Sequence, residues 1–142
     1  WREAGLYVVV QVIGAVLGVI AAHLMFATPI VELSQHVRTG GAQWWSEFVA
    51  TFGLLAVIIS TSRSNHETTP VAVAAYITAA YWFTASTSFA NPAVTLARTL
   101  TDTFAGIRPV DSLGFIVMQI MGAVAAVLVF RWFYSAGKTK AS

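Results

Sequence analysis

The sequence predicts an all-α membrane protein, and three observations carry this prediction. The chain has 142 residues, of which 57% are hydrophobic and only 10% are charged, whereas soluble domains carry about 25% charged residues. Its mean hydropathy is +0.72, and several uncharged runs are long enough to cross a bilayer. A helix-start signal also falls at the end of an uncharged stretch rather than in a polar loop. We therefore expect a lipid bilayer to surround most of the chain.

Four segments are predicted to cross the membrane. They are residues 6–27, the segment from Trp44 to Arg63, the segment from Pro70 to Phe83, and the segment from Leu113 to Tyr134. Polar residues separate them, and aromatic residues stand where interfaces are expected. The connection from Asp102 to Asp111 is predicted to be a loop, with Gly106 and Pro109 as helix breakers.

A short helix is predicted to begin at Asn91-Pro92. Asn is a preferred N-cap residue and Pro fits the first helical position. No charged side chain occurs between Glu67 and Arg98, so this start lies at membrane depth. Hydrocarbon does not tolerate unpaired N–H groups, so such a start must be covered by protein or line a wet cavity. The alternative is that Asn91 only caps a buried helix, but the surroundings favour a pore.

An internal repeat relates the first and last crossing segments. Residues 7–16 align with residues 115–124 at an offset of 108, which pairs Gln11 with Gln119 and Gly14 with Gly122. Residues 84–101 are too short to cross the membrane as loop plus helix. If they enter and return on one side, each repeat has three crossings and the repeats are inverted, as in several transport folds.

This repeat defines the expected domain organisation. Residues 1–142 form a single transmembrane domain, with the last helix of repeat one at 6–27 and repeat two at 44–134. The offset would place the start of repeat one before the first residue, so we expect the chain to be truncated at the N-terminus by about 65 residues.

Lysines and arginines suggest an orientation. The predicted crossings place the basic residues on two sides of the membrane. One side has Arg2, Arg63, Arg131, Lys138 and Lys140, and the other has Arg38, Arg98 and Arg108. The larger group is predicted to be cytoplasmic. The segment containing Asn91 then enters from the outer face of a multi-pass protein, which we expect in a bacterial inner membrane.

Several function classes find no support in the residues. The chain has no cysteine and only three histidines, and these histidines do not cluster, so we expect no metal and no cofactor. The net charge of +2 is small and scattered, which argues against nucleic acid as a partner. No nucleophile–base pair is visible, so the protein is not expected to be an enzyme.

Together these features resemble the aquaporin (major intrinsic protein) family. The resemblance covers essentially the whole chain, as the third to sixth helices and the second half-helix of a six-helix inverted-repeat fold. It rests on three features, namely the half-helix start Asn91-Pro92-Ala93, Glu47 early in the preceding helix, and the paired glutamine–glycine helices. The family implies a passive channel for small uncharged solutes and a homotetramer with four pores. Asn91 would donate its amide to a passing solute.

The residues that would form the selectivity filter depart from the pattern of water-selective members. Those members usually carry Arg directly after the second Asn-Pro-Ala, where this chain has Val94. The other filter positions in this half correspond to Ala79 and Ser88. A one-residue misalignment at Ala79 remains open, because Tyr81 lies nearby. The combination is similar to bacterial aquaglyceroporin relatives of the arsenic-resistance type. It implies passage of water, glycerol and metalloid hydroxides such as arsenite.

Two charged residues near this site admit two interpretations each. Glu47 either accepts hydrogen bonds from the re-entrant loop, as in the family, or lies at headgroup depth. Arg98, four residues after Val94, either supplies a cation in the outer vestibule or extends to the membrane surface.

Two rival functions remain at this point. An inverted-repeat secondary transporter would need a coupling carboxylate at mid-membrane, and Glu47 lies too near a helix end. A truncated, non-conducting membrane fragment would only pack against other helices.

Overall fold

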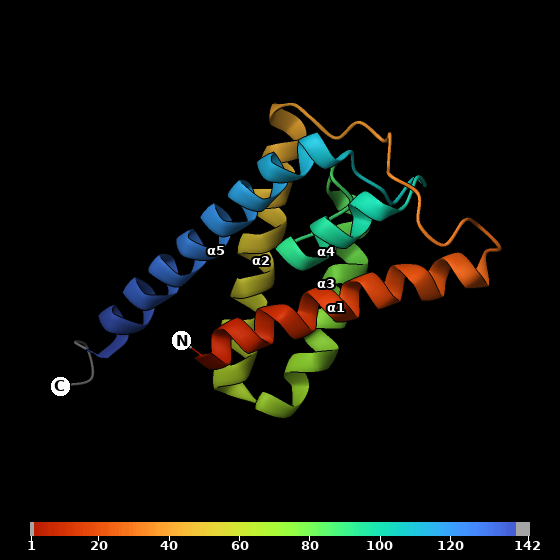
Figure 1. The fold of residues 1–142 in the computed structure, drawn as a ribbon. Coiled ribbons are helices and arrows are strands. Elements are labelled where there is room, and N and C mark those ends of the chain that lie inside the picture. The colour runs from red at the N-terminus through yellow and green to blue at the C-terminus, as the bar shows by residue number, and fades with distance from the viewer. Residues whose placement is uncertain (1, 139–142) are drawn as a thin grey trace. The chain divides into compact units, whose positions relative to one another are not determined.

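The computed structural model describes residues 2–138, so Lys140 lies outside the described residues. Every regular element in this range is a helix (Figure 1). In chain order these are α1 (Arg2–Met25), α2 (Gly41–Ser64), the 3₁₀ turn η1 (His66–Thr68), α3 (Thr69–Phe83), α4 (Pro92–Ala97), the 3₁₀ turn η2 (Arg98–Leu100) and α5 (Pro109–Lys138). The predicted all-α fold class is confirmed.

Three helices in the described range are long and apolar enough to cross a membrane, namely α1, α2 and α5. At 24 residues each, α1 and α2 rise about 36 Å, which exceeds a hydrocarbon core of about 30 Å. Helix α3 has 15 residues and rises only about 22 Å. The predicted third crossing is therefore shorter than its neighbours, because the chain turns to an extended conformation at Thr84.

The last helix begins earlier than predicted. Pro109 was expected to break a helix, but it opens α5. Proline suits the first turn of a helix because its missing N–H would have no intrahelical partner there. The backbone N–H of Asp111 donates to the Arg108 carbonyl over 2.9 Å, so the turn is already closed at this point. The predicted loop is correspondingly shorter.

The chain divides into two compact units that share α5. The first contains α1, residues 26–40, α4, η2 and α5 as far as Ile116. The extended residues 28–40 run along the segment after α4. The N–H groups of Glu32 and Ser34 donate to the carbonyls of Leu100 and Thr99 over 3.1 and 3.0 Å. This connection is held to η2 by backbone hydrogen bonds.

The second unit contains α2, η1, α3, residues 84–90 and α5 from Val117. Helices α2 and α3 lie against each other, and the Tyr76 hydroxyl donates to the Ala50 carbonyl over 3.0 Å. A Cβ at Gly122 would collide with the Phe48 carbonyl of α2. Gly122 therefore permits the close helix approach that small residues allow in membranes.

Candidate functional site

The short helix α4 begins where the sequence predicts. Asn91 adopts an extended conformation, and its side-chain Oδ1 accepts a hydrogen bond from the Ala93 N–H over 2.8 Å. Pro92 occupies the first position and has no N–H to satisfy. The start of the helix is thus stabilised by its own sequence, and the predicted helix start is confirmed.

Hydrogen bonds at both its oxygen and its nitrogen orient the Asn91 carboxamide. While Oδ1 caps the helix, Nδ2 donates to Gln11 Oε1 of α1 over 3.3 Å. A carboxamide nitrogen has two N–H donors, so one is left for another acceptor. The sequence singled out Asn91, whereas Gln11 was noted only as the repeat partner of Gln119. The structure adds that Gln11 orients Asn91.

The loop before α4 has an unusual backbone. Thr87, Ser88 and Ala90 have φ values of 61°, 50° and 50°, in the left-handed region where a residue with a Cβ costs about 1–2 kcal/mol. Such conformations persist only where surrounding contacts fix them, and they concentrate at functional sites. Residues 84–90 are therefore a shaped loop rather than a loose connection.

Helix α2 supplies these contacts. Gln43 Nε2 donates to the Ala85 carbonyl over 2.9 Å, and Ser46 Oγ accepts from the Ala85 N–H over 3.2 Å. Gln43, Ser46 and Glu47 are spaced i, i+3 and i+4, so they share one face of the helix. Of these three residues, only Glu47 was expected from the sequence to be a site residue. The helical spacing of the two other polar residues was the signal that could have identified them.

Glu47 is fully buried and makes the strongest of these contacts. Its Oε1 accepts from the Phe89 N–H and its Oε2 from the Ala90 N–H, both over 2.9 Å. Gln119 Nε2 of α5 also donates to Oε2, over 2.6 Å. Several donors offset the cost of burying a carboxylate. The contacts are those expected of a loop-supporting residue, and the burial is unlike a position in the headgroup layer.

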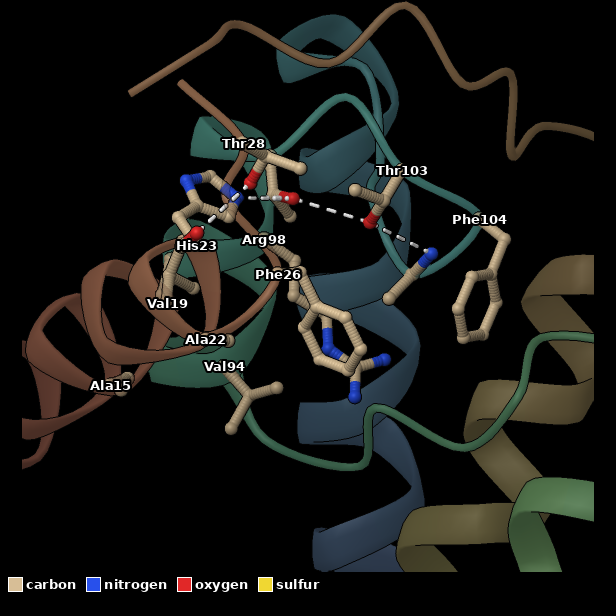
Figure 2. Close-up of a pocket in the computed structure, with 14 residues that line it drawn as sticks. Ala15, Val19, Ala22, His23, Phe26, Thr28, Val94, Arg98, Thr103 and Phe104 are labelled. Atoms are coloured by element: carbon tan, nitrogen blue, oxygen red, sulfur yellow. Dashed lines mark hydrogen bonds between the residues drawn. The ribbon is translucent and has the colours of Figure 1, made fainter. Parts of the chain in front are cut away.

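The first unit also contains a cavity of roughly 710 Å³ (Figure 2). Figure 2 shows the side chains of Phe26, Val94 and Arg98 extending into it. It is lined by Ala15, Gly18, Val19, Ala22, His23, Phe26, Thr28, Val94, Ala97, Arg98, Thr101, Thr103, Phe104 and Ala105. Val94 and Arg98 line the same cavity, as their four-residue spacing predicts.

The remaining filter candidates belong to the second unit. Ser88 is 4% exposed, and its Oγ makes no hydrogen bond within the described residues. Ala79 lies on α3 with its side chain exposed, whereas the adjacent Ala80 is fully buried. Val94, in the first unit, is half-buried.

One wall of the cavity is a chain of polar groups, drawn as dashed lines in Figure 2. The buried His23 contacts the Ile30 carbonyl through Nδ1 over 2.9 Å and Thr101 Oγ1 through Nε2 over 2.7 Å. Thr101 Oγ1 contacts Thr103 Oγ1 over 3.2 Å, and the Ala105 N–H donates to Thr103 Oγ1 over 3.3 Å. His23 is thus a buried polar group with both ring nitrogens hydrogen-bonded.

Arg38 fixes the loop that carries part of this wall. It is 3% exposed, and its Nε and Nη2 donate to the carbonyls of Gly106 and Phe104 over 2.7 and 2.6 Å. Its backbone N–H donates to Asp111 Oδ2 over 2.9 Å. From the sequence, Arg38 was expected only to be a charged residue in a loop. Its carbonyl partners lie more than sixty residues away, so no local pattern predicts these hydrogen bonds.

Asp111 also pairs with Arg108, whose Nε lies 3.0 Å from Asp111 Oδ2. The hydrogen bonds that Arg108 donates to the Asp111 carboxylate raise the pKa of Arg108 above its ordinary value. The pair therefore remains charged at neutral pH and ties the end of the loop to the start of α5.

These features define a class of protein, namely a multi-pass α-helical membrane protein. Its short helix α4 is capped by an asparagine and follows a loop that hydrogen bonds from α2 hold in place. Comparison with known proteins is more specific. Residues 63–142 match the model of the family described as major intrinsic protein. An aquaglyceroporin, AqpS, of Rhizobium meliloti (strain 1021) is 56% identical over 131 residues, covering 92% of this chain and 56% of that protein. No solved structure matches significantly.

The chain therefore belongs to the major intrinsic protein family. It spans a little over half the length of the curated relative that it matches.

Proposed function

We propose that the protein is a passive channel for small uncharged solutes, with Asn91, Pro92 and Ala93 at the start of a pore half-helix. The observation that carries the proposal is the Asn91-capped start of α4 behind a loop clamped by a buried carboxylate. A helix N-terminus has positive potential, and Asn91 Nδ2 can donate to a polar solute. Both features disfavour cations and protons.

The proposed filter consists of Ala79, Ser88 and Val94, with Arg98 in the outer vestibule. Two of these side chains are small and one is aliphatic, and the buried Ser88 hydroxyl makes no hydrogen bond within the described residues. Such a filter is wide and weakly polar, which suits glycerol better than water alone. The similarity to a protein named aquaglyceroporin supports the same substrate class. We include neutral metalloid hydroxides such as arsenite, which have a comparable hydroxylated surface.

The rival transporter mechanism is less well supported. A coupling carboxylate has to gain and release a proton or ion, whereas both Glu47 oxygens accept hydrogen bonds from backbone and side-chain N–H groups. The proposal is thus a channel without enzymatic activity. We further propose a homotetramer in a bacterial inner membrane and, from the sequence repeat, a single transmembrane domain over residues 1–142.

The test replaces Val94 by Arg in the protein expressed from its complete gene and reconstituted into vesicles. The added cation narrows the filter, so glycerol and arsenite fluxes should fall at least tenfold while osmotic water flux falls much less. Val94→Leu adds bulk without charge and serves as the matched control. It should reduce glycerol flux only slightly.

Two results would contradict this assignment. Equal loss of water and glycerol flux in Val94→Arg would indicate a blocked or misfolded pore rather than a changed filter. Unchanged glycerol flux would remove Val94 from the filter.

A further inference from the structure

A second, smaller cavity lies at the end of α2 and α5, in the second unit. It has a volume of roughly 190 Å³ and is lined by Arg63, Arg131, Tyr134 and Ser135. Arg131, Tyr134 and Ser135 are spaced i, i+3 and i+4 on α5, so they share one helix face. Arg63 belongs to the last turn of α2. We call this cavity the arginine pocket.

The described residues that line the pocket include two arginines and no carboxylate. The Arg63 guanidinium carbon lies 4.2 Å from the centre of the Tyr134 ring, a cation–π contact that fixes its position. Within residues 2–138, neither Arg63 nor Arg131 is paired with an acidic side chain. Two like charges at one small cavity favour an anion between them.

The position of the pocket indicates the source of that anion. Trp132 and Phe133 directly follow Arg131 in sequence and are 70% and 64% exposed. Exposed aromatic residues beside arginines at a helix end are typical of the membrane–water interface, where lipid phosphates lie. Arg63 and Arg131 also belong to the predicted cytoplasmic group, and basic pockets between transmembrane helices on that side bind anionic headgroups.

We propose that the arginine pocket binds the phosphate of an anionic phospholipid headgroup. Arg63 and Arg131 would donate charge-assisted hydrogen bonds to the phosphate oxygens. Tyr134 positions Arg63, and the adjacent aromatic residues contact the acyl chains. The site is independent of the proposed pore residues, so a lipid bound here joins the ends of α2 and α5 without entering the solute pathway.

The test titrates the protein in a neutral detergent with short-chain phosphatidylglycerol or phosphatidylcholine and counts bound lipid by native mass spectrometry. Phosphatidylglycerol should bind in preference to phosphatidylcholine. Arg63→Gln and Arg131→Gln should each weaken phosphatidylglycerol binding about fivefold, the effect of one basic residue near an anionic surface. Arg2→Gln removes a cation from the same predicted membrane face but lies outside the pocket. It should leave the binding unchanged.

Lysine variants distinguish a loss of lipid binding from a loss of folding. Arg63→Lys and Arg131→Lys keep the charge but lose the planar fork that binds phosphate bidentately, so they should weaken binding less than glutamine does. Equal binding of both lipids, equal losses in Arg2→Gln, or full binding in the Arg63→Gln, Arg131→Gln double variant would overturn the proposal. Displacement by millimolar inorganic phosphate would also overturn it, because it would indicate a site for soluble anions. Solute flux should stay at the wild-type level in these variants, which separates this test from that of the channel.

Discussion

At the scale of single residues, Glu47 best explains how the loop before α4 keeps its shape. A buried carboxylate is costly unless it is hydrogen-bonded, and here backbone and side-chain N–H groups converge on it. Their bonds hold Phe89 and Ala90 next to the start of α4, and Ala90 itself is left-handed. The energy of these bonds offsets the conformational cost of the loop. We propose that Glu47 supports the backbone geometry of this loop through these hydrogen bonds.

We expect Glu47→Gln to lower both stability and solute flux. The neutral amide keeps one acceptor oxygen, but its NH₂ group would face an N–H donor, and bonds to a charged acceptor are worth about 1.5–3 kcal/mol each. Thermal unfolding in detergent should therefore shift down by several degrees. Glu67→Gln, at an exposed position in η1, is the matched control and should behave like the wild type. Wild-type stability and flux in Glu47→Gln would show that the loop does not depend on the charge.

At the scale of elements, the sequence predicts the helices better than the connections. Hydropathy locates α1, α2 and α5, and Asn91-Pro92 locates α4 to the residue, because both signals are local. The extended residues 28–40 were predicted only as a loop. Their partners, Thr99 to Arg108, are far away in sequence, and no local pattern encodes that pairing.

The same distinction applies to the site. Asn91 and Glu47 were predicted as site residues, since each stands out as polar within an apolar helix or stretch. Gln119 was noted only as the repeat partner of Gln11, and its contact with Glu47 depends on how α2 packs against α5. Arg38 was missed as a loop clamp, because an arginine in a polar loop is ordinarily exposed.

Arg38→Gln should loosen the segment after α4. The variant removes charge-assisted bonds to the carbonyls of Phe104 and Gly106. We expect the amides of Ile107 and Arg108 to exchange with solvent at least about tenfold faster, since one such bond is worth about 1.5–3 kcal/mol. The amides of α2, in the other unit, serve as the internal control. Unchanged exchange at Ile107 and Arg108, or equal acceleration in α2, would contradict the assigned role.

At the scale of the whole molecule, the orientation in the membrane can be tested with little disturbance. The chain contains no cysteine, so a single introduced thiol reports its own accessibility. Thr39 lies in the connection predicted to be outside, and Ser64 lies at the end of α2 predicted to be cytoplasmic. Both are exposed.

In intact cells, Thr39→Cys should react with a membrane-impermeant maleimide, whereas Ser64→Cys should react only after the cells are opened. The cysteine-free parent gives the background. Labelling of Ser64→Cys in intact cells, with Thr39→Cys protected, would invert the orientation and place the arginine pocket at the outer face.

The hydrogen bonds along the polar wall of the larger cavity all have a defined donor and acceptor. A carbonyl can only accept, so Nδ1 of a neutral His23 carries the proton that bonds Ile30, and Nε2 accepts from the Thr101 hydroxyl. The Thr103 hydroxyl must then donate to Thr101, while it accepts from the Ala105 N–H. The hydroxyl protons of Thr101 and Thr103 are thus both used in hydrogen bonds within the wall. These groups offer acceptors rather than donors, so a solute that brings its own O–H donors is matched at this wall.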